Sequence, residues 1–181
     1  LVAALSDAGQ LMEYDDETVT RAEFIQSLIS LLDIKWGGNV SFGDVDSGTE
    51  LYDAVCAAVG AGLIGNSEVF RPDDNITLYE AYKICVSACG YGIEAEFNGG
   101  YPYGYAAIGA KLGIADGVSG SSEISGKDAY RILFNTLEAN YLEFDNGGYK
   151  KGEGNVMYAY RSVEEISGIV TSNSTAATGS F

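Results

Sequence analysis

The chain has 181 residues, of which 46% are apolar, and carries a formal net charge of −16 from 26 acidic and 10 basic side chains. This balance argues against nucleic acid or an anionic membrane as a partner, because either contact needs a basic face. No run of about 18 apolar residues occurs, so no segment is predicted to span a membrane. Histidine is absent, which removes the commonest general base and metal ligand.

A helix-start pattern first appears near the beginning of the chain. Residues 1–5 are apolar and look like the end of a helix, without an initiator Met or a signal peptide, so we expect a mature chain or an excised fragment. In Thr20-Arg21-Ala22-Glu23 the threonine and glutamate can form a capping box, in which each side chain accepts from the other residue's backbone N–H. The apolar spacing from Phe24 to Leu32 predicts a helix behind this cap.

The middle of the chain predicts two helices joined by a turn. The first helix covers about 51–60, with Ser47 and Glu50 as its capping box and Gly62 in the left-handed position after its end. The second begins at Thr77-Leu78-Tyr79-Glu80, another capping box. Its apolar stripe consists of Ala81, Ile84, Cys85, Ala88 and Cys89.

The third part repeats this order. Residues 103–117 mirror 52–66 at an offset of 51, so that Gly113 matches Gly62. A weaker cap, Ser125 with Asp128, starts a helix whose apolar stripe includes Leu133 and Phe134. Beyond residue 140, glycines at 147–148, 152 and 154 indicate turns, 156–160 and 166–170 resemble short strands, and 172–180 resembles a linker.

The three capped helices are predicted to converge on one core. Each is too short to be stable alone in water, and only its neighbours can cover its apolar stripe. The side chains expected to be buried together are Phe24, Leu28, Cys85, Leu133 and Phe134, with Val55, Val59 and Ile108 from the helices that precede the capped ones.

The motifs of the middle part resemble the S-layer homology domain. They are Phe42-Gly43-Asp44-Val45, a helix, Gly62-Leu63-Ile64-Gly65, and Phe70-Arg71-Pro72 followed by Ile76-Thr77 and Glu80-Ala81. Thr20-Arg21-Ala22-Glu23 is that family's signature tetrapeptide. The resemblance covers residues 1–140 and implies a mainly α fold of three tandem helix-loop-helix modules around a pseudo-threefold axis. It divides the chain into modules 1–41, 42–91 and 92–140, with a β-containing tail, 141–181.

The resemblance also implies a function. Such modules bind secondary cell-wall polysaccharide non-covalently, often through a pyruvylated amino sugar, and so hold a secreted protein on the outside of the cell wall. The signature arginine of the family contacts the anionic sugar, and only Arg21 stands at that place, since Leu78 and Gly126 occupy the equivalent positions. The expected saccharide-binding residues are Thr20, Arg21, Glu23, Thr77, Tyr79 and Glu80. No cofactor or metal is expected.

Other interpretations stay open at this point. Loss of two signature arginines favours a degenerate module that assembles with other surface-protein subunits or with its own downstream domains, through tyrosine-rich faces. Tyr52, Tyr79, Tyr101, Tyr103 and Tyr105 either stack on sugar or pack between modules. Cys56, Cys85 and Cys89 are core residues, or Cys56 forms a disulfide to the second helix. The carboxylates Asp44, Asp46, Glu50, Asp73 and Asp74 fit no calcium loop, and no nucleophile–base pair indicates an enzyme.

Overall fold

The structure is a computed structural model that describes residues 15–35, 37, 40, 42–119, 122–145 and 148–161. Its elements, in chain order, are α2 Arg21–Leu32, α3 Glu50–Gly60, α4 Leu78–Ala88, α5 Gly92–Phe97, α6 Tyr103–Lys111, α7 Gly126–Glu138, β1 Asn140–Asp145, β2 Gly148–Asn155 and α8 Val156–Arg161. The fold is therefore mainly α with a short antiparallel hairpin near its C-terminal end. No described helix is both long and apolar enough to cross a bilayer.

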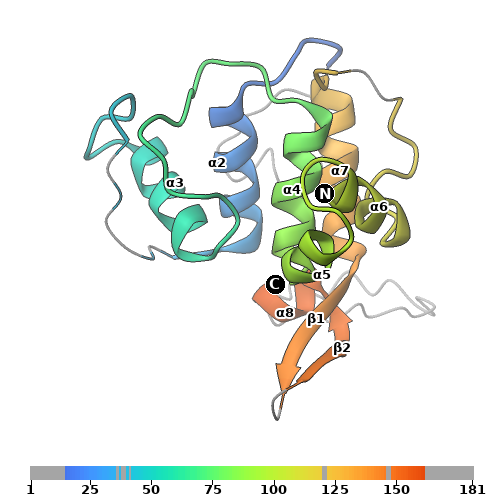
Figure 1. Cartoon of the computed structure of the whole chain (residues 1–181). Helices are drawn as coiled ribbons and strands as arrows, with labels where there is room; N and C mark the ends of the chain where they lie inside the picture. Colours follow the sequence, from blue (N-terminus) through green and yellow to red (C-terminus); the bar gives the residue numbers. More distant parts are fainter. Residues whose placement is uncertain are drawn as a thin grey trace, which may run out of the picture.

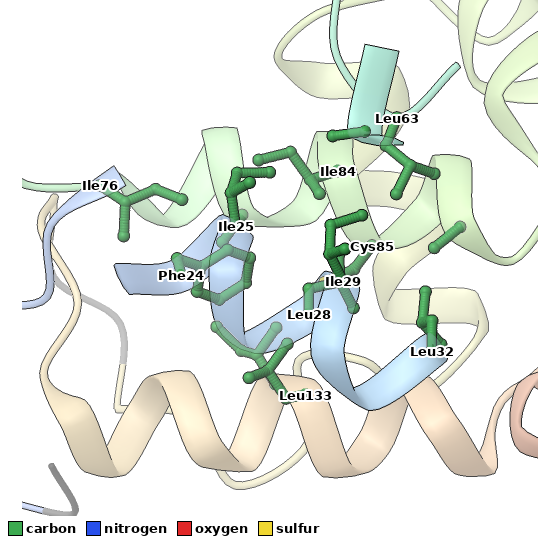
Figure 2. Packing of buried hydrophobic residues seen from close by; sticks show 14 of the residues in the cluster. Phe24, Ile25, Leu28, Ile29, Leu32, Leu63, Ile76, Ile84, Cys85 and Leu133 are labelled. Carbon is green, nitrogen blue, oxygen red and sulfur yellow. The ribbon is translucent and has the colours of Figure 1, made fainter. Parts of the chain in front are cut away.

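The three capped helices α2, α4 and α7 stand side by side at the centre (Figure 1). α3 packs on α2, while α5 and α6 pack on α4. Figure 2 shows Phe24, Leu28 and Leu133 lying together between the helices, with Cys85 close by, and all four side chains are fully buried. Burial of the apolar stripes supplies the main driving force for packing these short helices.

Backbone hydrogen bonds tie the starts of the three central helices into a closed ring. Val19, Ile76 and Ile124 each precede a cap residue and are buried. The N–H of Val19 donates to the carbonyl of Ile124, that of Ile124 to Ile76, and that of Ile76 to Val19, at 3.1, 3.3 and 2.8 Å. The ring places the three helix starts around one axis.

A second set of bonds repeats with the same threefold order. The first N–H groups of a helix have no partner inside the helix. Here the first helical residue of α2, α4 and α7 donates to a loop carbonyl that precedes the cap of another central helix. The pairs are Arg21 to Asp74 at 2.9 Å, Leu78 to Ser122 at 3.0 Å and Gly126 to Glu17 at 2.9 Å.

The predicted helix ends at Gly62 and Gly113 are confirmed. Both glycines adopt positive φ, 71° and 76°, just beyond α3 and α6. The residue after each, Leu63 or Ile114, donates its N–H back to the helix at 2.9 Å and buries its side chain. This is the Schellman arrangement, in which glycine avoids the strain of a left-handed backbone.

Three local predictions are wrong. The cap of α3 is Thr49, whose hydroxyl accepts from the N–H of Tyr52, and not Ser47. Residues 156–161 form helix α8 and not a strand, because the Asn155 side chain accepts from the N–H of Tyr158 and so starts a helix. The expected turn around Gly152 and Gly154 lies inside β2.

The predicted core is confirmed except at one position. Val55 and Ile108 are buried and Val59 is partly buried, as expected. Phe134, however, is 43% exposed. It lies one residue beyond Leu133 on α7, and a single helical step turns the side chain by about 100° away from the apolar stripe. The expectations for residues 1–5, 166–170 and 172–180 lie outside the described residues.

The hairpin and α8 pack against the ends of the central helices opposite their caps (Figure 1). The N–H of Leu142 donates to the carbonyl of Cys89 at 2.9 Å, and the Tyr160 hydroxyl donates to the carbonyl of Ala88 at 3.2 Å. The guanidinium of Arg161 donates to the carbonyls of Ser30 and Leu31 at the end of α2. These contacts supply additional donors to carbonyls in and just after the last turns of α2 and α4, where intrahelical donors run out.

Candidate functional site

A cavity of about 240 Å³ lies between the start of α2, the first turns of α4, the loop 63–70 that joins α3 to α4, and the loops that carry Phe42 and Tyr101. Its wall combines buried apolar side chains with charged groups from α2 and α4. The lining residues are Arg21, Phe42, Leu63, Ile64, Gly65, Ser67, Val69, Phe70, Glu80, Lys83, Ile84 and Tyr101. Polar and apolar groups contribute about equally to the exposed lining, so the cavity offers both hydrogen-bond partners and apolar contact to a small ligand. The volume is below the roughly 300–1,000 Å³ of sites for drug-sized molecules, so it suits one ring rather than a long chain.

Arg21 enters the cavity from the first turn of α2. Its Nη1 donates to Oε1 of Glu80 at 2.8 Å, and its Nε donates to the carbonyl of Phe70 at 2.9 Å. The guanidinium carbon lies 5.0 Å from the centroid of the Phe70 ring, a cation–π contact. Only 14% of the side chain is exposed, and burial lowers the pKa of Arg21 against the attraction of Glu80. Arg21 nevertheless stays charged at neutral pH.

Glu80 connects the cap of α4 with this arginine. Its Oε2 accepts from the N–H and the hydroxyl of Thr77, at 3.0 and 2.9 Å, while Oε1 accepts from both Arg21 and Arg71. Burial alone raises the pKa of the Glu80 carboxyl, but the Thr77 hydrogen bonds and the two arginines outweigh it, so the pKa is lower than usual. Glu80 is therefore an ionised, fully engaged group at neutral pH.

Asp44 holds the loop that forms one side of the cavity. Its two carboxylate oxygens accept from the N–H groups of Phe70 and Arg71, at 2.8 and 2.6 Å. These bonds lower the pKa of Asp44, the Phe70 bond most. Arg71 is held at φ 61°, a left-handed conformation that few L residues adopt. Within the described part of the chain, no group of three or more His, Cys, Asp or Glu side chains could hold a metal ion.

Lys83 and Tyr101 also line the cavity, and the sequence did not single Lys83 out. The Lys83 ammonium lies 5.5 Å from the Tyr101 ring centroid and 5.8 Å from that of Tyr105. Tyr105 is buried, and its hydroxyl donates to Glu96 at 2.8 Å. From sequence alone, a helical lysine that lines a cavity cannot be distinguished from a helical lysine that is exposed to solvent. The ring contacts that fix it come from a loop and helix outside the motif.

The expected saccharide-binding residues separate into two groups. Arg21 and Glu80 meet in the cavity. Thr20 and Glu23 form the capping box of α2, and Thr77 caps α4 together with Glu80, as predicted. Tyr79 does not line the cavity; it is 43% exposed and packs edge-on against Tyr82 at 6.5 Å.

The remaining tyrosines and the cysteines also take distinct places. Tyr52 donates its hydroxyl to the carbonyl of Val40, whereas Tyr103 is 75% exposed. Cys56, Cys85 and Cys89 are buried free thiols, so the disulfide interpretation is wrong. Burial raises the pKa of Cys85 to about 12 and that of Cys89 further, which makes both thiols unreactive core residues.

The equivalent positions in the other capped helices differ chemically. Leu78 and Gly126 occupy the place of Arg21, as their backbone bonds show. Asp128 takes the place of Glu80 in α7. Its carboxylate accepts from the N–H and hydroxyl of Ser119 where Glu80 accepts from Arg71. Among the described residues, the arginine–glutamate arrangement thus occurs between α2 and α4 and not between α4 and α7.

Comparisons with known proteins show which family and which proteins the chain is similar to. Residues 41–81 match the family model of the S-layer homology domain. The chain is 42% identical over 74 residues to Exoglucanase XynX of Acetivibrio thermocellus, covering 40% of the chain and 7% of the exoglucanase. It is 32% identical over 117 residues to the Surface-layer 125 kDa protein of Lysinibacillus sphaericus, covering 61% of the chain and 10% of that protein. It is 26% identical over 136 residues to the Surface layer protein of Brevibacillus choshinensis, covering 71% and 12%. The chain thus spans a small fraction of each relative.

Proposed function

We propose that this chain anchors a surface protein to the bacterial cell wall by binding secondary cell-wall polysaccharide in the cavity between α2 and α4, because residues 41–81 match the family model of the S-layer homology domain. The protein would then act outside the cell, attached to the wall. The relatives include surface-layer proteins and an exoglucanase, and the aligned segment is 12% or less of each relative's own length. A shared segment in proteins of such different names favours an attachment role over catalysis by the segment itself.

The observation that carries the proposal is the composition of the cavity. A sugar ring offers apolar C–H faces and hydroxyl groups, and the cavity offers apolar walls beside the charged groups of Arg21, Glu80 and Lys83. The whole chain has a net charge of −16, yet these lining residues include two cations and one anion. An acidic saccharide therefore meets locally favourable charge in an otherwise repulsive molecule.

The proposal extends to three modules, 1–41, 42–91 and 92–140. The closed ring formed by Val19, Ile76 and Ile124 supports it, since each module contributes one equivalent residue. The first helical N–H of each capped helix also reaches a loop of another module. A groove between modules can thus be lined by several modules at once, and the cavity beside Arg21 has lining residues from all three, Tyr101 being that of the third.

Sedimentation with purified walls tests the function. The walls come from Lysinibacillus sphaericus, Brevibacillus choshinensis and Acetivibrio thermocellus, each prepared intact and stripped of polysaccharide. The protein is expected to pellet with at least one intact wall and with no stripped wall, and the soluble polysaccharide should compete. Pelleting with no intact wall, or equally with intact and stripped walls, would contradict the proposal.

A second function has one structural observation in its favour. Phe97, the last residue of α5, and Tyr103, the first residue of α6, are 88% and 75% exposed. Large aromatic side chains are enriched at protein interfaces. A degenerate module that assembles with other surface-protein subunits would use such a face. Sedimentation velocity over a range of concentrations separates the two functions: self-association without wall binding favours assembly, and a monomer that binds walls favours anchoring.

A further inference from the structure

Two cationic side chains, those of Arg21 and Lys83, line the cavity, and their surroundings differ. Arg21 and Arg71 face Glu80, and Arg71 also lies 3.3 Å from Asp74. Two positive and two negative charges in this cluster balance each other. Arg21 also uses Nε on a backbone carbonyl and one face on Phe70, so its charge is paired with Glu80 and two of its five N–H donors are engaged within the protein.

Lys83 differs because, in the described part of the chain, its ammonium has no carboxylate within ion-pair distance. The side chain is half-buried, and its ammonium lies over the rings of Tyr101 and Tyr105. Such rings attract a cation without neutralising its charge. Because Tyr105 is itself fixed by Glu96, the ammonium is held at the cavity wall in advance of binding.

We infer that Lys83, and not Arg21, recognises the negative charge of the bound saccharide. The inference rests on the proposed function and names the residue that determines its specificity for an acidic sugar. The ligand class is a sugar ring with one anionic substituent, a carboxylate or a phosphodiester, that lies against the Lys83 ammonium. Arg21 is then a positioning residue that holds Glu80 and the Phe70 loop in the shape the ring requires.

Binding to the intact walls described above, measured at low and high salt, tests the inference. Lys83→Gln removes the charge, Lys83→Arg keeps it, and Lys111→Gln is a matched control because Lys111 pairs with Glu94 and does not line the cavity. We expect Lys83→Gln to raise the Kd about tenfold or more at low salt, the effect of losing a hydrogen bond to a charged group. Its Kd should also no longer rise with salt. Lys83→Arg and Lys111→Gln should keep the salt dependence of the unaltered chain.

Arg21→Gln provides the contrasting result. Because Arg21 is a positioning residue, its replacement by Gln should weaken binding by the same factor at low and high salt. Amidating the wall carboxyl groups with a carbodiimide identifies the source of the charge: loss of salt-dependent binding indicates a carboxylate, and unchanged binding a phosphodiester.

The possible failures are distinguishable. If Lys83→Gln binds with the Kd and salt dependence of the unaltered chain, the inference is overturned while wall anchoring stands. If Arg21→Gln abolishes the salt dependence instead, Arg21 recognises the charge and the inference is likewise overturned. If the unaltered chain binds no wall, the proposed function itself fails. Thermal melting of each variant shows whether it is folded at the temperature of the binding measurements. We expect Lys83→Gln to have the melting temperature of the unaltered chain.

Discussion

Arg21 and Glu80 lie on two different capped helices, 59 positions apart in the chain, and their side chains meet at 2.8 Å. The same glutamate also completes the capping box of α4 through its other oxygen. One carboxylate therefore fixes a helix start, a contact between two helices and one side of the cavity. Any change at this pair should be felt in both stability and binding.

Replacing Arg21 with Ala should destabilise the fold as well as weaken wall binding. The change leaves a mostly buried Glu80 with one arginine fewer and removes the cation over Phe70. The expected loss is about 1–3 kcal/mol in the free energy of unfolding. Urea unfolding followed by circular dichroism measures it. Arg131→Ala, at an exposed position of α7, is the control and should change the free energy by less than about 0.5 kcal/mol.

Acid should weaken the fold partly through Glu80. Its pKa in the folded chain is below the ordinary value of 4.5, so the unfolded chain binds the proton more readily. The stability it contributes is present above that ordinary value and is lost as pH falls through the lower, folded pKa. Unfolding free energies measured from neutral pH downward should show a smaller acid-induced loss for Glu80→Gln than for the unaltered chain. Identical pH profiles would show that Glu80 does not contribute.

Filling the cavity should abolish wall binding without unfolding the protein. Gly65 lines the cavity, a Cβ added there meets no atom within 4 Å, and its backbone has no positive φ. Gly65→Phe should therefore be tolerated by the backbone while its ring occupies the ligand space. The neighbouring Asn66 is exposed and does not line the cavity, so Asn66→Phe is the matched control and should bind as before. Unimpaired binding by Gly65→Phe would place the ligand elsewhere.

Two adjacent residues of α7 should respond very differently to truncation. Leu133 is fully buried between α7 and α2, whereas Phe134 is 43% exposed. Leu133→Ala should cost about 2–5 kcal/mol because it leaves a cavity in the core. Phe134→Ala should cost about 1 kcal/mol, since the side chain is only partly buried and its loss leaves no enclosed cavity. The midpoints of denaturant unfolding, compared between the two variants when their m-values are equal, measure this difference in stability.

The sequence predicts the parts of this fold that local chemistry decides. The caps at Thr20 and Thr77 and the glycine after α3 are specified by neighbours within a few residues, and all three are confirmed. The prediction that Phe134 is buried is wrong because the apolar run 132–134 is continuous, and residue type alone does not tell which member turns away from the core. The prediction of a strand over 156–160, where α8 lies, is wrong because a short apolar run fits either strand or helix until a cap such as Asn155 is recognised.

For the site, sequence could select Arg21 but not its surroundings. The partner Glu80 belongs to another capped helix, and its contact with Arg21 depends on the ring that brings the helix starts together. Lys83 is chemically ordinary in sequence, and its place over Tyr101 depends on the path of the chain between α5 and α6. Both are long-range consequences of packing, which helix periodicity does not encode.

The ring through Val19, Ile76 and Ile124 also bears on how the chain folds. Each of its bonds joins segments that are far apart in sequence. Helical proteins owe their usual speed to local contacts, but these central contacts span about fifty residues or more, which predicts slower folding than a simple bundle of this size. Solenoid repeats can unfold one unit at a time because each touches only its neighbours. A closed ring has no terminal unit to lose, so the three capped helices should form and melt in a single cooperative transition.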